Sequence, residues 1–265
     1  MTHITFIHGL WLSALAWAPW VDLFTSEGYE ADAPGWPGEA STIAATRADP
    51  NSQAGVGIGD LVQHFSAVLP PRETRPVVIG HSFGGLIAQR LLADDRVAAA
   101  VAISPAPIKG VTSLPLAQLR SALPVLARGR NRDRAKALSR GQFRFGFGNA
   151  LPKQESDALW ETWNIPSPGR PLFEVASANK ESHSPAFVDT KATRGPLLMI
   201  AAEMDHTVPA VTTRAAFDLY SNSSSTTELR SFEGKGHSLT IDHGWRAVAD
   251  DVLAWLQSQE LSAPR

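Results

Sequence analysis

The sequence predicts an α/β fold with a mostly parallel β-sheet. Short apolar runs of strand length alternate with longer stretches that have helical spacing, and this alternation is typical of parallel sheets covered by helices on both faces. The 265 residues suit one domain, or one core with an insertion. A hydrophobic fraction of 43% with 19% charged residues excludes a disordered chain.

Six runs are the expected strands, and five longer segments between and after them are the expected helices. The expected strands are residues 4–7, 29–33, 76–79, 97–103, 197–201 and 226–232. The expected helices are residues 17–26, 58–69, 83–93, 210–220 and 245–257. Residues 58–69 illustrate the helical spacing, because their apolar side chains recur at positions 58, 61, 62, 65, 68 and 69.

The alternation stops between residues 107 and 189, where no clear strand is seen. Structureless loops of that length are rare, so we expect short helices that form a cap over the sheet. The core is then residues 1–106 with 190–265. Residues 107–153 carry ten Lys or Arg and one acidic residue. This charge either is paired within a solvated surface or steers an anionic substrate.

Composition limits the possible partners and cofactors. With 24 basic and 26 acidic residues, the chain has no electrostatic basis for general nucleic-acid binding. It has no Cys, its His residues lack ligand-like spacing with acids, and no apolar run reaches membrane-spanning length. Residues 1–3 lead directly into an expected strand and lack the cationic start and longer apolar stretch of a signal peptide, so we expect no such segment. We therefore expect a cytoplasmic protein without metal, cofactor, nucleic-acid or membrane partner; the oligomeric state is not determined.

The strongest motif is Gly80-His81-Ser82-Phe83-Gly84, which lies between an expected strand and an expected helix. Glycines on both sides of a serine allow a sharp turn that exposes the hydroxyl as a nucleophile. The helix that follows directs its first N–H groups toward any oxyanion formed there. Ser82 is therefore the candidate nucleophile.

A serine nucleophile needs a base and an orienting carboxylate. His237 follows the last expected strand in a loop with Gly234 and Gly236, and Asp205 follows the strand before it. Both would lie at the carboxyl edge of the sheet, where sites of open α/β sheets collect. The predicted triad is Ser82, Asp205 and His237. Other candidates are His243 for the base and Glu203 or Asp189 for the acid.

The end of the first strand carries His8-Gly9-Leu10. A glycine there lets the backbone approach a substrate carbonyl. The N–H groups of Leu10 and Phe83 are the predicted oxyanion hole, and His8 is expected to support this loop by hydrogen bonding.

Together these motifs resemble the α/β-hydrolase fold family, over the whole chain outside residues 107–189. The match is nearest to the group of small esterases and hydroxynitrile lyases, and to haloperoxidase-like esterases. The resemblance implies about six parallel strands and a cap. The lyases of that group carry a Lys after the catalytic His, whereas Ser238 follows here.

The resemblance and the triad imply a serine hydrolase that cleaves a small to medium carboxylic ester, or a lactone or thioester, through an acyl-enzyme. Alternatives are a cofactor-independent lyase or oxygenase and a non-catalytic ligand receptor. Aromatic residues are candidates for the substrate pocket, although most could equally be core. The pocket candidates are Trp11, Phe143, Trp160 and Trp163.

Overall fold

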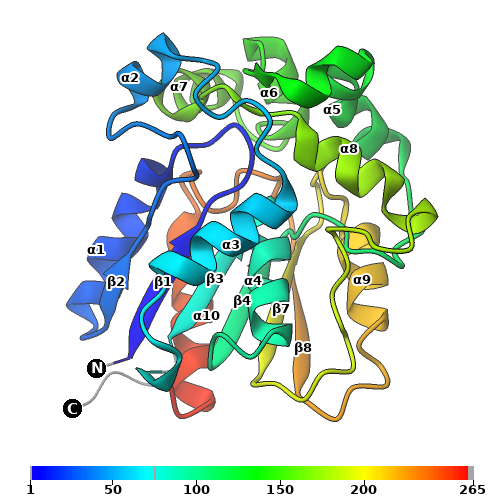
Figure 1. The fold of residues 1–265 in the computed structure, drawn as a ribbon. Coiled ribbons are helices and arrows are strands. Elements are labelled where there is room, and N and C mark those ends of the chain that lie inside the picture. The colour runs from blue at the N-terminus through cyan, green and yellow to red at the C-terminus, as the bar shows by residue number, and fades with distance from the viewer. Residues whose placement is uncertain (1, 75, 262–265) are drawn as a thin grey trace.

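A computed structural model describes residues 2–74 and 76–261, and its centre is a six-stranded parallel sheet (Figure 1). The strand order β2-β1-β3-β4-β7-β8 confirms the prediction of about six parallel strands. The strands are β1 (His3–Ile7), β2 (Glu30–Asp32), β3 (Val77–His81), β4 (Ala99–Ile103), β7 (Leu197–Ala202) and β8 (Thr227–Phe232).

Helices cover both faces of the sheet, as the alternation predicted. One face carries α1 (Ala18–Ser26) and α10 (Trp245–Ser258), whose buried side chains share one apolar cluster. The other face carries α3 (Ile58–Val68), α4 (Phe83–Ala93) and α9 (Ala210–Asp218), which contribute to a second cluster. In Figure 1, α3 and α4 lie in front of the strands and α10 behind them.

The alternation of side chains along β4 shows how the strands supply both clusters. Ala99, Val101 and Ile103 pack on the face of α1 and α10, whereas Ala100 and Ala102 pack on the face of α3 and α4. Successive side chains of a strand point to opposite faces, so a strand covered on both sides must be apolar throughout. This is why the four inner strands β1, β3, β4 and β7 could be found as apolar runs, whereas the edge strands β2 and β8 are only partly buried.

Within residues 107–189, the helices α5 to α8 form a layer above the carboxyl edge of the sheet (Figure 1). We call this segment the cap insertion. Its elements are α5 (Leu116–Leu126), η3 (Gly129–Asp133), β5 (Ala135–Lys136), α6 (Arg140–Gly146), α7 (Lys153–Trp163), β6 (Ser167–Pro168), α8 (Arg170–Ser177) and η4 (Ala178–Lys180). Besides short helices, the segment contains one pair of strands that was not predicted, because β5 and β6 pair antiparallel. At two residues each, these strands are too short for an alternating pattern.

The N-terminal half also contains elements that the periodicity did not reveal. The helix α2 (Ile43–Ala48) joins the cap layer, and the Arg47 side chain donates a hydrogen bond to the Asn164 carbonyl at 2.9 Å. Its six residues are too few to show helical spacing. Two 3-10 turns, η1 (Ala14–Trp17) and η2 (Arg72–Thr74), complete the fold. Among the described residues, no helix is long and apolar enough to cross a bilayer.

Candidate active site

The turn between β3 and α4 holds Ser82 in a conformation that side chains rarely adopt, with φ 56° and ψ −118°. Such a backbone costs about 1–3 kcal/mol and persists only where the surroundings enforce it. A Cβ on Gly80 would lie 2.0 Å from the Gly84 carbonyl oxygen, and a Cβ on Gly84 would lie 2.0 Å from that of Ile7. Only glycine can therefore occupy these two positions of the motif.

The end of β1 comes into direct contact with this turn. A Cβ on Gly9 would lie 2.6 Å from the Ser82 Cβ and 3.2 Å from its Oγ. The next residue is Leu10, and the residue after Ser82 is Phe83, the first residue of α4. The first N–H groups of a helix have no intrahelical acceptor. Leu10 and Phe83, whose N–H groups are the predicted oxyanion hole, are thus the residues that directly follow Gly9 and Ser82, which are in contact.

The cap insertion anchors the loop after Leu10. The backbone N–H of Trp11 donates to the Ser167 hydroxyl at 2.7 Å, and the Trp11 carbonyl accepts from Ile165 N–H at 3.1 Å. Trp11 itself has φ 67°. These bonds fix the direction in which the chain leaves β1.

His237 and Asp205 form a buried pair, with His237 Nδ1 2.7 Å from Asp205 Oδ2 and both side chains without solvent exposure. The other carboxylate oxygen accepts the backbone N–H groups of Thr207 and Val208, each at 2.7 Å. An ionised carboxylate can only accept hydrogen bonds, so Nδ1 is the protonated nitrogen. The Nε2 lone pair of His237 is then free to take a proton.

Two aromatic contacts position the His237 ring. The His81 ring lies 4.5 Å from it, and the Phe147 ring lies 4.7 Å away at 80°. Burial lowers the pKa of His81 well below its ordinary value, so this neighbour is neutral at pH 7.

His237 Nε2 is buried and has no hydrogen-bond partner among the described residues, so no bond to Ser82 Oγ is formed in this structure. Catalytic hydrogen bonds are often loose without substrate and tighten when it binds. The structure therefore brings His81, next to Ser82, against His237, but does not show the serine–histidine bond.

The alternative acid and base candidates are occupied elsewhere. His243 is 69% exposed and pairs with Glu155 at 2.9 Å. Glu203 pairs with Arg214, and Asp189 is exposed in a loop. None of the three is bonded to Ser82 or His237.

A buried ion pair between His8 and Glu39 supports the loop after β1. The sequence predicted the supporting role of His8 but not its partner. His8 Nε2 lies 2.9 Å from Glu39 Oε2, both side chains are 2% exposed, and Nδ1 lies 2.8 Å from the Gly9 carbonyl oxygen. Burial raises the pKa of Glu39, but the charge of His8 and hydrogen bonds from Ser13 and Ala14 outweigh this and hold the pKa at about 2. His8 thus has the supporting role expected of it. Glu39 lies beyond a Pro- and Gly-rich turn, and no sequence pattern marked it.

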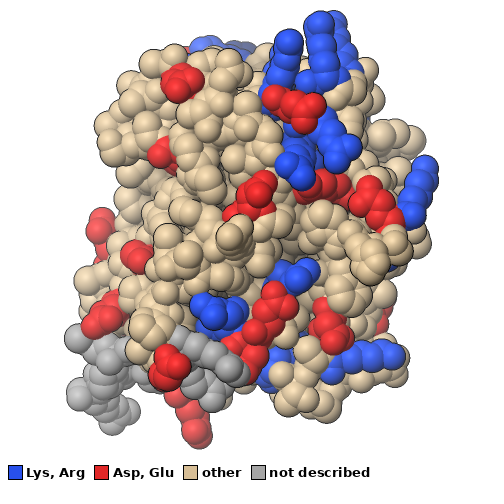
Figure 2. Space-filling model, in the orientation of Figure 1, with Lys and Arg blue, Asp and Glu red and all other residues tan. Residues whose placement is uncertain are grey.

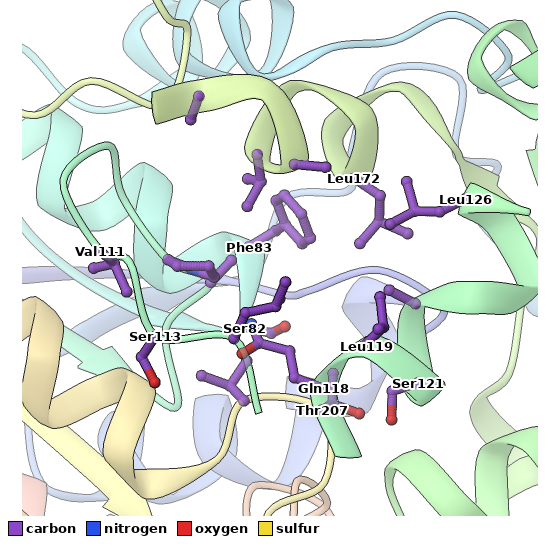
Figure 3. Close-up of a pocket in the computed structure, with 18 of the residues that line it drawn as sticks. Ser82, Phe83, Val111, Ser113, Gln118, Leu119, Ser121, Leu126, Leu172 and Thr207 are labelled. Carbon is purple, nitrogen blue, oxygen red and sulfur yellow. The ribbon is translucent and has the colours of Figure 1, made fainter. Parts of the chain in front are cut away.

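A cavity of about 230 Å³ opens beside Ser82, between the sheet edge and the cap insertion. Its lining is mostly apolar, and Figure 3 shows Ser82 and Phe83 facing Leu119 of α5 and Leu172 of α8. Polar side chains of Gln118 and Thr207 also reach it. The sequence did not single out these cap residues, because their spacing is indistinguishable from that of ordinary helices.

The structure places the four pocket candidates differently. Trp11 lines the cavity, whereas Phe143, Trp160 and Trp163 are absent from its lining among the described residues. Phe143 is fully buried and stacks on Phe147 at 4.8 Å, and Trp160 donates to the Leu138 carbonyl. Phe143 is part of an apolar cluster, and Trp160 and Trp163 are partly buried against the same cluster.

The part of the chain that the structure describes contains no group of three or more His, Asp or Glu side chains that could hold a metal ion.

One sequence family matches this chain. The profile described as "Alpha/beta hydrolase family" matches residues 6–251, which is most of the chain. The chain belongs to the alpha/beta hydrolase family. No curated protein matches it significantly.

Solved structures with this fold are distant in sequence. A monoacylglycerol lipase of Paleococcus ferrophilus is 19% identical with a TM-score of 0.66, covering 97% of this chain and 94% of that one. A methylesterase of Arabidopsis is 15% identical with a TM-score of 0.66, covering 97% and 100%. Tomato methylketone synthase I, complexed with β-ketoheptanoate, is 16% identical with a TM-score of 0.67, covering 97% and 98%. At these identities the likeness shows the fold alone.

Replacement of Glu39 by Gln should destabilise this α/β hydrolase in a pH-dependent way. The Glu39 pKa falls from 4.5 to about 2 on folding. Its contribution is therefore full above pH 4.5 and is lost as the pH falls toward 2. We expect Glu39→Gln to lower the free energy of unfolding by about 2–3 kcal/mol at pH 7, with a smaller gap at acidic pH. Urea unfolding from pH 3 to 7 measures this. Glu30→Gln, an exposed control, should change little, and a gap independent of pH would refute the assignment.

Proposed function

We propose that this α/β hydrolase is a serine esterase that cleaves a small to medium carboxylic ester, lactone or thioester. The carrying observation is the buried Asp205–His237 pair, whose free Nε2 lies in the same region as the strained Ser82 turn. Esterase and lipase names among proteins of the same fold agree with this chemistry.

In the proposed mechanism, Ser82 Oγ attacks the ester carbonyl while His237 Nε2 takes its proton. Asp205 holds the imidazole in the tautomer with a protonated Nδ1 and stabilises the imidazolium that forms. The N–H groups of Leu10 and Phe83 bind the tetrahedral oxyanion. His237 then protonates the leaving alcohol, and the same imidazole activates water to hydrolyse the acyl-enzyme.

The cavity suggests where the acyl group is held. Ligand pockets usually measure about 300–1,000 Å³, so a cavity of about 230 Å³ is small. Its apolar walls come from α5 and α8, and they begin at the nucleophile. We propose that a short to medium acyl chain occupies it.

Replacement of Ser82 by Ala should abolish hydrolysis. We expect kcat/KM for p-nitrophenyl butyrate to fall by at least about 10³-fold, because only binding and oxyanion effects remain. A fluorophosphonate probe should label the wild type and not Ser82→Ala. Ser113→Ala, which changes another serine of the same cavity, should keep both activity and labelling. Labelling that survives in Ser82→Ala would refute the nucleophile.

A measurement of intact mass separates the esterase from a cofactor-independent lyase. An esterase forms a serine-bound acyl group, which intact-mass measurement detects as an adduct with an ester whose deacylation is slower than its acylation. A lyase that uses Ser82 only for positioning forms no adduct.

Asp205→Asn should remove activity without loss of the fold. The amide can still accept from Thr207 and Val208, but its NH₂ group faces His237 Nδ1 and favours the wrong tautomer. We expect kcat to fall by up to about 10⁴-fold with a near-normal melting temperature. Glu203→Gln is the matched control and should be active. A loss in Glu203→Gln but not in Asp205→Asn would move the acid to Glu203.

Ala122→Phe should shorten the acyl chain that the enzyme accepts, because Ala122 lines the cavity from α5. We expect kcat/KM for an octanoyl ester to fall at least about tenfold, while an acetyl ester changes only a few-fold. Ala117→Phe, on the same helix but outside the lining, is the control. Equal losses for both esters would place the acyl chain elsewhere.

A further inference from the structure

The helix α5 exposes leucines along a face that begins at the rim of the cavity. Leu116, Leu119 and Leu123 are 84%, 38% and 46% exposed, and Leu114, just before the helix, is 66% exposed. Positions 116, 119 and 123 follow one helical face. These four leucines, which we call the α5 face, form a concentration of exposed apolar side chains.

A group of unpaired cations follows α5 directly. We call it the basic run; it consists of Arg128, Arg130, Arg132, Arg134 and Lys136. All five residues are exposed, and within the described chain their side chains form no hydrogen bond or ion pair. By contrast, Arg140 and Arg144 pair with acids of α7. Figure 2 shows Lys and Arg gathered at the upper end of the molecule, where Figure 1 places α5 and α6.

None of the residues of the basic run lines the cavity among the described residues. The α5 face does reach the cavity. Leu114 and Leu119 are both exposed and part of its lining, which also contains Ser82. An apolar path therefore leads from the protein surface to the candidate nucleophile.

We propose that the α5 face and the basic run together bind the surface of a lipid layer with anionic head groups. Exposed leucines beside arginines are the combination that holds a helix in an interface, because apolar side chains enter the acyl boundary while cations meet the head groups. The expectation of no membrane partner rested on the lack of a spanning segment, and an interfacial contact needs none. The proposal does not depend on the esterase activity, since binding requires no turnover.

The charge distribution disfavours a second copy of the chain as the binding partner of the α5 face. A two-fold contact through the α5 face would bring the two basic runs close together. Like charges at such an interface are repulsive. An anionic surface instead complements the five cations.

The test is cosedimentation of the full chain with lipid vesicles. We expect binding to phosphatidylcholine vesicles that contain phosphatidylglycerol, and much weaker binding to phosphatidylcholine alone.

Binding should weaken from about 0.01 M to 1 M salt, as the Debye length falls from about 30 Å to 3 Å. Arg130→Gln with Arg132→Gln should weaken binding roughly tenfold to thirtyfold at low salt. Leu116→Gln with Leu123→Gln should weaken it at least about tenfold.

Controls separate this proposal from the esterase. Val68→Gln and Arg246→Gln change exposed residues outside the cap insertion, and both variants should bind vesicles like the wild type. Ser82→Ala should also bind vesicles normally. The Arg130→Gln with Arg132→Gln variant and the Leu116→Gln with Leu123→Gln variant should keep the kcat/KM of the wild type for soluble p-nitrophenyl butyrate. Absent binding, or binding that neither anionic lipid nor the variants alter, would overturn the proposal. Dimerisation in light scattering that Leu116→Gln abolishes, without vesicle binding, would also overturn it and assign the face to self-association.

Discussion

The close approach of three backbone segments around Ser82 is the constraint on which this structure depends. The turn after β3 packs against the end of β1, and a single Cβ at Gly80, Gly84 or Gly9 would lie 2.0–2.6 Å from a neighbouring atom. This contact holds Ser82 at positive φ and places the start of α4 and the end of β1 on either side of it. Core packing thus sets the geometry of the nucleophile and of the backbone donors.

Two buried carboxylates fix the remaining groups from different directions. Asp205 uses one oxygen to bind its own loop and the other to hold His237, so the position of the imidazole follows from β7 and its loop. Glu39 fixes the loop after β1 by pairing with His8. The His8 ring stacks on Trp36 and contacts the Gly9 carbonyl. Each buried charge is balanced by a partner and several hydrogen bonds, which burial requires.

The core could be predicted because the inner strands β1, β3, β4 and β7 are almost wholly buried and because the backbone geometry of the turn after β3 requires glycine at Gly80 and Gly84. Ser82 was found through its glycines, and Asp205 and His237 through their places after strands. Glu39 could not be found, because its partner is 31 residues away and no periodic pattern connects them. The pocket candidates show the same limit: Phe143 and Trp160 are aromatic like Trp11, but only the packing of the cap shows which side chains reach the cavity.

The cap helix α5 explains why its region resisted prediction. Periodicity finds helices that have one apolar and one polar face. In α5 the inner face must be apolar to line the cavity, where Ala122 and Leu126 lie, and the outer face exposes Leu116 and Leu123. The apolar positions of α5 keep helical spacing, but Pro115 directly before the helix and Pro124 inside it are residues that usually end or kink a helix, so its bounds were not visible in the sequence. Its two apolar sides have a physical reason: α5 separates an apolar cavity from the outside of the protein, where Leu116 and Leu123 are exposed.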